Sequence, residues 1–460
     1  CIRDLLSRSI PRLKDKEPGE TIVSRANHVA DGDLMEDDHL LEETKNAVMN
    51  LDNSDLSIQG PPGTGKTYIA SHVIIELMRK GKRVGITSNS HKAIHVLLEK
   101  IEAEAIKQDF DFVGIKKASG DDPETYYQGI DGSRKFIFNL DKPASLDTIV
   151  SNEGIPDDTY GFNVIPLADG DMLSFDTSSA IERPRVWSSH RKRTEEENED
   201  APEGVEKTSP DEPWLQSAQL FAGTAWLFAR PKFREQLDYL VIDEAGQVSL
   251  ANVVAMGTAT KNIVLGGDQM QLAQPIKGTH PGDAGTSGLV FLLGNNRVIP
   301  PEKGIFLDTT RRLHPDICDF VSHAFYEGKL KAHPLTKKRS LVLNSGSLPK
   351  TGIRMVLSEH RGCIQTSVEE GKIVGSYYTE LLKQQFQDVD SDGTLQPPQA
   401  ISEKDILVVT PYNAQDLHLR TILPNDSKIG TVDKFQGQEE QVVLISMVTS
   451  TSEDIPRNME

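Results

Sequence analysis

The chain is poor in cysteine and has no long apolar run. Its three cysteines, Cys1, Cys318 and Cys363, are too far apart in the sequence to form a CxxC pair. A disulfide framework and a structural zinc cluster are therefore unsupported. No stretch approaches the roughly 20 consecutive apolar residues of a membrane-spanning helix, and the first residues lack the apolar core of a secretory signal. We therefore expect no membrane partner. We expect the protein to be cytoplasmic or, in a eukaryote, nuclear.

Positive charge is also scarce. Lys and Arg number 50 against 69 Asp and Glu, so the formal net charge is −19. This net charge argues against a protein that coats nucleic acid by bulk charge, although a local basic groove is compatible with it. The 460 residues are enough for two to four domains. Because the chain starts at Cys1 rather than Met, we expect a piece of a longer protein.

Two regions alternate short β-branched segments with longer amphipathic ones, the pattern of βα units around a parallel sheet. The first region comprises residues 45–105 and 217–299, and the second comprises residues 300–460. Residues 1–44 are an N-terminal lead-in to the first region. The pattern of the first region predicts one helix, Thr67–Lys80, and four strands, Leu56–Gln59, Arg83–Thr87, Tyr239–Ile242 and Asn262–Gly266. The second predicts five strands: Gly304–Leu307, Arg354–Leu357, Asp405–Val409, Gly430–Val432 and Val442–Ser446. The fold class is therefore α/β with two domains.

An insertion in the first domain is predicted at residues 106–216, where the periodicity fails. Its segment Thr194–Pro213 holds nine acidic residues against one lysine, which favours a disordered surface loop. The preceding stretches RKFIFNL and TYGFNVIPL predict a small β structure.

The strongest motif is GPPGTGKT, which follows a predicted strand and precedes a predicted helix, as a P-loop does. Its glycines let backbone N–H groups face phosphate oxygens, and the helix N-terminus adds its positive dipole end. We expect the whole motif to bind nucleotide, with the lysine on the β and γ phosphates and the last threonine on Mg²⁺: Gly60, Pro61, Pro62, Gly63, Thr64, Gly65, Lys66 and Thr67. A chance glycine-rich turn is the alternative, and the strand–loop–helix context speaks against it.

Two further motifs follow apolar strands. LVIDEAGQ places Asp243 and Glu244 at the end of an apolar strand. Asp243 is our candidate Mg²⁺ ligand, and Glu244 is our candidate for the group that deprotonates the attacking water. A solvated turn is the alternative. In GGDQMQLAQP, Gln271 is our candidate sensor of the γ phosphate, and a polar turn is the alternative. No NKxD-like motif for guanine follows, so ATP is favoured over GTP.

The order of motifs resembles superfamily-1 helicases of the nonsense-mediated-decay (Upf-like) type. The resemblance covers about 350 of the 460 residues and rests on GPPGTGKT, VIDEAGQ, GDQMQL, TTRRLHP, VVTPYNAQ and TVDKFQGQEEQVVLIS. Within that group, GTAWLFAR and FLDTTRRLHPDICDFVSHAFYEGKL look most like the helicase half of RecB-like nuclease–helicase fusions. That likeness implies a nuclease domain before Cys1 in the same parent chain.

The resemblance implies two RecA-like P-loop NTPase domains, with ATP and Mg²⁺ in the cleft between them and single-stranded nucleic acid across their tops. It assigns catalysis to Lys66, Glu244, Gln271 and an arginine finger, Arg312, and it places Glu439 beside the nucleotide. Without the family match, a surface arginine paired with acids is the favoured interpretation of Arg312.

The resemblance also implies nucleic-acid contacts. The matching residues are small hydroxyls and neighbours at strand ends, which suit phosphate contacts: Ser90, His91, Thr224, Thr410, Pro411, Tyr412 and Thr431. Each hydroxyl could instead cap the following helix. A basic run, either a strand contact or a solvated loop, comprises Lys329, Lys331, Lys337, Lys338 and Arg339. DNA and RNA are not distinguished, and 5′ to 3′ polarity follows from the resemblance alone.

The chain departs from the family pattern in three places. The family's QYRMHP is TRRLHP here, so Thr310 and Arg311 replace Gln and Tyr, and Thr44 stands where an adenine-reading glutamine is expected. The chain also ends at Glu460, before the family's last motif and second catalytic arginine. The sequence predicts an ATP-dependent helicase or translocase motor; an ATP-switched clamp or remodeller that separates no strands is the alternative.

Overall fold

The structure is a computed structural model that describes most of the chain. The described residues are 1–23, 36–118, 122–130, 136–140, 165–166, 173–174, 186–187, 218–272, 278, 280–346, 348–390, 393–435 and 437–450. The chain forms two compact units. The first includes the described residues up to Gly60 and then Gly65–Phe306. The second includes the loop tip Pro61–Thr64 and the residues from Leu307 onward.

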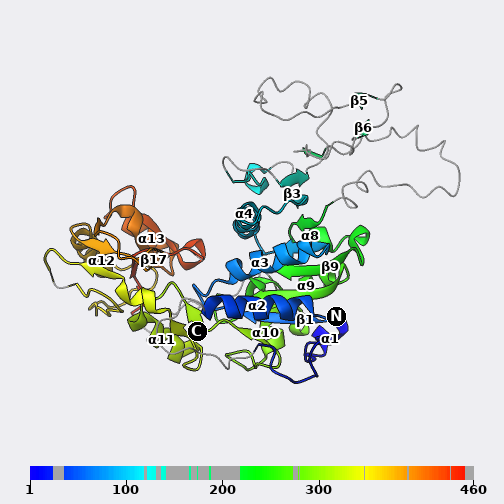
Figure 1. The fold of residues 1–460 in the computed structure, drawn as a ribbon. Helices are drawn as coiled ribbons and strands as arrows, with labels where there is room; N and C mark the ends of the chain where they lie inside the picture. The colour runs from blue at the N-terminus through cyan, green and yellow to red at the C-terminus, as the bar shows by residue number, and fades with distance from the viewer. Residues whose placement is uncertain are drawn as a thin grey trace. The chain divides into compact units, whose positions relative to one another are not determined.

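A nine-stranded sheet, parallel throughout, forms the centre of the first unit (Figure 1). In spatial order its strands are β11 (Gly304–Phe306), β1 (Asp55–Gln59), β10 (Thr260–Gly267), β9 (Leu237–Ile242), β2 (Val84–Thr87), β8 (Leu220–Ala222), β3 (Gly114–Lys117), β4 (Ile137–Leu140) and β7 (Val186–Trp187). All residues of β1, β2 and β8 are buried. Such continuous burial is typical of a parallel sheet covered on both faces.

The helices of the first unit follow the strands they connect. They are α1 (Ile2–Leu6), α2 (Glu36–Met49), α3 (Lys66–Arg79), α4 (His91–Lys107), α8 (Ala225–Phe228), α9 (Leu250–Gly257) and α10 (Gly288–Leu293). Helix α3 buries Ile69, Val73 and Leu77, spaced at one helical face, and packs against α2 and α4. The short 3₁₀ helices of this unit are η1 (Pro123–Thr125), η2 (Pro231–Phe233), η3 (Ala245–Gln247) and η4 (Gly282–Gly285).

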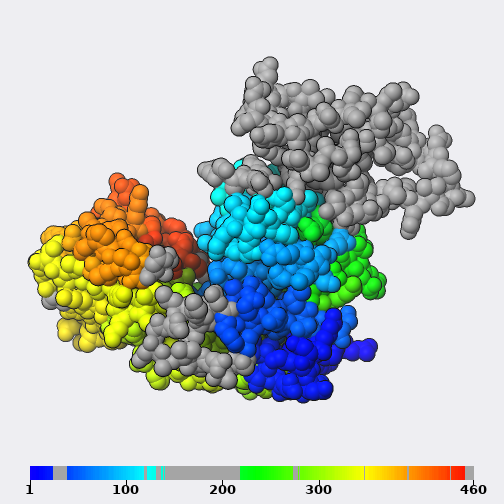
Figure 2. All heavy atoms as spheres, viewed as in Figure 1, coloured from blue at the N-terminus to red at the C-terminus, as the bar shows by residue number. Residues whose placement is uncertain are grey.

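The second unit is built around a smaller parallel sheet. Strand β17 (Ile406–Thr410) lies between β18 (Lys428–Thr431) and β19 (Val442–Ile445). Helices α12 (Val368–Leu381) and α13 (Asn413–Arg420) bury Tyr378 and Leu419 in the core beside these strands. This part of the unit is yellow to orange in the space-filling view (Figure 2).

The remaining elements of the second unit are short. They are β12 (Thr309–Thr310) with β13 (Lys331–Ala332), the antiparallel β14 (Ser340–Val342), β15 (Gln385–Gln387) and β16 (Gln399–Ala400), helix α11 (Pro315–Phe325), and the 3₁₀ turns η5 (Pro334–Lys338), η6 (Glu403–Asp405) and η7 (Val432–Phe435).

The predicted α/β class is confirmed, and two predicted strands need correction. Gly304–Leu307 was expected in the second domain, but β11 pairs in parallel with β1 of the first sheet. A short apolar segment predicts a strand without indicating which sheet receives it. Arg354–Leu357 forms no strand, and Met355 and Leu357 are 83% and 86% exposed. Its apolar side chains have no sheet face to pack on.

The predicted insertion is partly continuous with the main sheet. Within residues 106–216, β3 and β4 extend the parallel sheet beyond β8, and β4 lies in the RKFIFNL stretch. The pair β5 (Ile165–Pro166) and β6 (Leu173–Ser174) is antiparallel, and β5 lies in TYGFNVIPL. The acidic segment Thr194–Pro213 lies outside the described residues. Among the helices of the described part, none is long and apolar enough to cross a membrane.

Candidate active site

The glycine-rich loop connects β1 to α3. Gly63 and Gly65 have φ of +76° and +83°, a conformation that costs glycine little and other residues more. The Lys66 amine donates a hydrogen bond to the Gly60 carbonyl at 2.7 Å. The Thr64 hydroxyl donates to the Pro61 carbonyl at 2.8 Å. The loop therefore has the tight backbone turn that a phosphate-binding nest requires.

The tip of this loop makes backbone contacts within the second unit. The Thr310 hydroxyl donates to the Pro62 carbonyl at 2.8 Å, and the Arg311 N–H donates to the Gly63 carbonyl at 2.8 Å. A methyl group added to Gly63 would overlap Cβ of Arg312 and lie 2.7 Å from the Thr310 hydroxyl oxygen. Glycine is thus required here for space as well as for conformation.

The acidic pair follows β9 in the first unit. Burial, together with the charge of Glu244, raises the pKa of Asp243 to about 6, while the Lys66 charge opposes the rise. An oxygen of Asp243 accepts a hydrogen bond from the Glu244 N–H at 3.0 Å. Glu244 itself has a φ of +51°. A non-glycine residue in this region is strained, and such strain often occurs at functional sites.

Three loops of the first unit converge beside this pair. The Gly60 N–H donates to the Gly267 carbonyl at 2.8 Å, which joins the P-loop to the end of β10. A Cβ on Gly267 would lie 2.8 Å from the Ala245 nitrogen, so the loops after β9 and β10 are in close contact. Asp268 is buried and accepts a hydrogen bond from the Gln271 side-chain amide at 3.2 Å. Gln271 is therefore oriented by Asp268.

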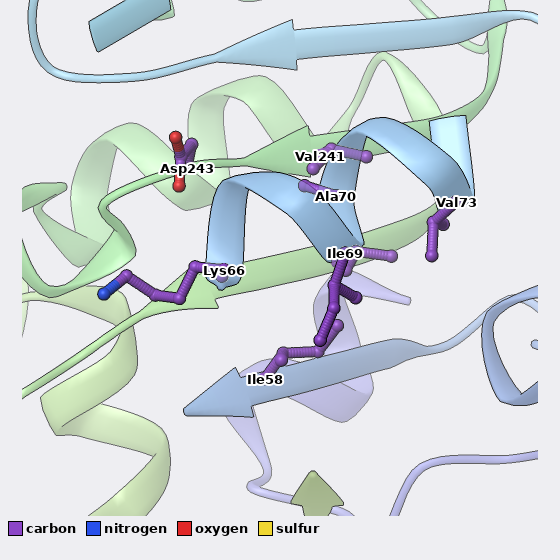
Figure 3. A pocket seen from close by; sticks show the side chains of 9 residues that line it. Ile58, Lys66, Ile69, Ala70, Val73, Val241 and Asp243 are labelled. Carbon is purple, nitrogen blue, oxygen red and sulfur yellow. The ribbon is translucent and has the colours of Figure 1, made fainter. Parts of the chain in front are cut away.

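A small cavity of about 20 Å³ lies between α3 and the sheet (Figure 3). Its lining is mainly apolar, including Ile69, Val73 and Val241. Figure 3 shows the Lys66 amine pointing away from these side chains and Asp243 at the end of the strand that carries Val241. Because the volume fits about one water molecule, this cavity is a packing defect and not the nucleotide site.

The donor set fits magnesium held jointly with a nucleotide. Among the described residues, no group of three or more His, Cys, Asp or Glu side chains could hold a metal ion. Mg²⁺ typically keeps several waters and takes one or two protein ligands plus substrate phosphates. The single buried carboxylate of Asp243 and the hydroxyl of Thr67, in the first turn of α3, match that requirement.

In the second unit, Arg312 forms an ion pair with Glu439, so two residues that the family resemblance places at the nucleotide contact each other. Burial lowers the pKa of the neighbouring Arg311. Arg339 donates hydrogen bonds to the carbonyls of Arg311 and Arg312, at 2.7 and 3.2 Å, and to the Asp388 carboxylate at 2.7 Å. Arg339 thus fixes the backbone of the predicted finger.

Arg339 is a residue whose role the sequence did not reveal. The sequence showed Arg339 only as a member of a basic run. Nothing in the sequence indicated that Asp388, 49 positions further along the chain, would accept its hydrogen bond. Neither predicted reading of the basic run, a nucleic-acid contact or a solvated loop, included this backbone-holding role of Arg339. Thr44, which takes the position of the family's glutamine, is fully buried and donates to the Leu40 carbonyl at 2.7 Å.

The predicted nucleic-acid residues of the first unit differ in availability. The Ser90 hydroxyl accepts a hydrogen bond from the Ala93 N–H at 3.2 Å, so it caps α4. Burial and the charges of Lys116 and His95 lower the pKa of His91 to about 4. Thr224 occupies the N-cap position of α8, but its side chain makes no capping bond.

The second unit carries the remaining candidates at the ends of β17 and β18. Thr410 is fully buried at the end of β17, and the Tyr412 hydroxyl lies 3.0 Å from that of Thr449. Thr431 is half-buried at the end of β18, and Pro411 is half-buried after β17. Because Thr410 is fully buried, its hydroxyl is less accessible than the side chains of Tyr412 and Thr431.

The fold and the loop geometry define the class of protein. A parallel sheet with a lysine-containing P-loop after one strand and an acidic pair after another is the arrangement of P-loop nucleoside triphosphatases. Family models described as "AAA domain" match residues 44–276 and 289–456. The chain belongs to this AAA-domain family and, within it, to the superfamily-1 helicases of the nonsense-mediated-decay type. Its α/β units are RecA-like domains.

The chain is similar to several known proteins. DNA polymerase alpha-associated DNA helicase A of Saccharomyces cerevisiae is 25% identical over 453 residues, covering 90% of this chain and 60% of the relative. A regulator of nonsense transcripts 1 homolog of Arabidopsis thaliana is 25% identical, covering 88% and 30%. The crystal structure of the arterivirus helicase, nonstructural protein 10, is similar with 11% identity and a TM-score of 0.35, covering 88% of this chain and 55% of that chain. The chain thus spans between 30% and 60% of the length of these proteins.

Proposed function

We propose that the chain is the motor region of an ATP-dependent nucleic-acid helicase, in which hydrolysis of ATP drives movement along a single strand. The observation that supports this most is the convergence of the P-loop with the loops after β9 and β10, joined by the hydrogen bond from Gly60 to Gly267. It brings Lys66, Asp243 and Glu244 to one edge of the sheet. The family match supports the same activity.

Lys66 has to change partner when ATP binds. Its amine donates to the Gly60 carbonyl at 2.7 Å and would exchange this bond for a charge-assisted bond to phosphate. Thr67 and Asp243 would hold Mg²⁺, which offsets phosphate charge when bound. Glu244 would accept the proton of the attacking water, and Gln271, oriented by Asp268, would report whether the γ phosphate is present.

Arg312 is the proposed arginine finger. Its guanidinium is paired with Glu439 and has to leave that carboxylate to reach a phosphate. Because Glu439 is 60% exposed, solvent screens the pair and the exchange costs little.

The proposed partner is single-stranded nucleic acid, DNA or RNA, bound mainly through its backbone. Thr224 of the first unit and Tyr412 and Thr431 of the second are proposed contacts, together with Ser90, His91, Thr410 and Pro411. Cytoplasmic or nuclear localisation and a nuclease domain in the parent chain are proposals that rest on the family resemblance alone.

The test separates binding from chemistry. Lys66→Ala should lose affinity for a fluorescent ATP analogue, whereas Glu244→Gln should bind it normally and hydrolyse ATP at least about 100-fold more slowly. Wild-type turnover in Glu244→Gln would remove that residue from the mechanism. An unwinding assay on a tailed duplex runs beside it: ATP hydrolysis without strand separation would favour an ATP-switched clamp.

A further inference from the structure

Trp226 is the most exposed large apolar side chain of the described first unit. It is 83% exposed, and the next such residue, Tyr68, is 47% exposed. The two residues that follow it, Leu227 and Phe228, are 3% and 0% exposed and anchor α8 in the core. Because α8 is fixed in this way, Trp226 cannot turn inward. A tryptophan ring can bury 150 to 250 Å², so leaving it in water is an unusual use of the residue.

Trp226 lies in α8, a few residues beyond the carboxyl end of β8. It follows β8, and β8 lies between β2 and β3 with Ala222 level with Ile86 and Lys116. Ligands of parallel α/β sheets bind beyond the carboxyl ends of the strands. Thr224, two residues before Trp226, has a hydroxyl that does not cap α8. Trp226 and Thr224 are therefore presented at the same edge.

The segment around Trp226 is basic, although the whole chain is acidic. From Ala225 to Glu235 it has three basic residues and one acidic residue, and Arg230 and Arg234 are exposed. Arg230 lies four positions after Trp226. An exposed aromatic ring in a basic segment, on a protein of net charge −19, suits a nucleic acid, which is a polyanion with flat bases.

We propose that Trp226 is a stacking platform for a base of single-stranded nucleic acid, next to a phosphate at Thr224. This inference rests on the proposed function and adds to it a contact with the bases. Every base has a π-face, so stacking holds a strand without selecting its sequence. A motor that moves along arbitrary sequence needs this kind of contact.

The experiment compares affinities for two oligonucleotides, one single-stranded with all bases present and one with abasic sites in its central part, by fluorescence anisotropy. Trp226→Ala should weaken binding of the intact strand about 5- to 100-fold, the loss expected for one stacked base. It should bind the abasic strand as wild type does. Trp226→Phe should restore most of the affinity. Ile106→Ala, at another exposed apolar position of the same unit, is the matched control.

The outcomes separate this inference from the proposed function. If the wild type fails to bind single strands, the proposed function fails first. If the wild type binds and Trp226→Ala binds equally well, the stacking role is overturned. It is also overturned if Trp226→Ala weakens both oligonucleotides equally, or if it lowers the melting temperature, because then the ring contacts protein.

Discussion

At the scale of single residues, Lys116 is a charge placed where water cannot reach it. It is fully buried, and its amine nitrogen has no hydrogen-bond partner among the described residues. Burial lowers the pKa of Lys116 to about 8, with Lys117 adding to the effect and Asp122 opposing it. His91 and His95 face the same amine, and its charge contributes to lowering both of their pKa values.

This burial makes stability depend on pH. Between about pH 8 and pH 10.5 the unfolded chain holds the Lys116 proton that the folded chain has lost, so stability rises with pH in that window. We predict that Lys116→Met raises the melting temperature at pH 7 and abolishes this rise, since it removes an unpaired buried charge. It should also raise the pKa of His91, followed by NMR. Lys107→Met, at an exposed position, is the control. An unchanged melting temperature would show that Lys116 has a partner.

At the scale of elements, the phosphate loop depends on a glycine for two reasons that can be separated. Gly63 and Gly81 both have positive φ, +76° and +72°, but an added Cβ meets Arg312 at Gly63 and nothing within 4 Å at Gly81. We predict that Gly63→Ala weakens nucleotide binding more than tenfold, because the loop has to move. Gly81→Ala should cost only backbone strain, about 1 to 2 kcal/mol, and leave nucleotide affinity intact. Equal affinity in the two variants would mean that the loop tip moves freely.

The segment that carries Arg312 depends on Arg339 and Asp388. Arg339 holds the finger by donating hydrogen bonds to the backbone carbonyls of Arg311 and Arg312. We predict that Arg339→Ala lowers the kcat for ATP about 10- to 100-fold with little change in KM, since misplacing a catalytic group by about 1 Å can cost 10²-fold. Arg339→Lys should recover part of the loss. Lys337→Ala, in the same basic run, should behave as wild type, and a change in KM alone would contradict a positioning role.

At the scale of the whole molecule, the parts that could be predicted are those with local signals. The P-loop, the acidic pair and eight strands follow from apolar runs bounded by glycines and polar residues, which act over a few residues. Membership of β11 in the first sheet depends on pairing with β1, about 250 residues away. The contact of Arg339 with the finger depends on the same kind of long-range folding. Pattern reasoning has no information about such distances, so it misplaced the first and missed the second.

The charge of the whole molecule sets the last prediction. A net charge of −19 repels a polyanion at long range, so attraction has to come from a narrow track of basic side chains and fade quickly with salt. We predict that the logarithm of the affinity for single strands falls linearly with the logarithm of the salt concentration, with a slope of about −0.7 for each phosphate neutralised. Anisotropy titrations at several KCl concentrations measure this slope.

Two variants separate charge from stacking. Arg230→Ala should reduce the magnitude of the slope by about 0.7 if that side chain neutralises one phosphate. Trp226→Ala should lower affinity at every salt concentration without changing the slope, because stacking releases no counterions. Binding that ignores salt would contradict a phosphate track on an acidic body, and a slope altered by Trp226→Ala would show that its ring acts through the charges around it.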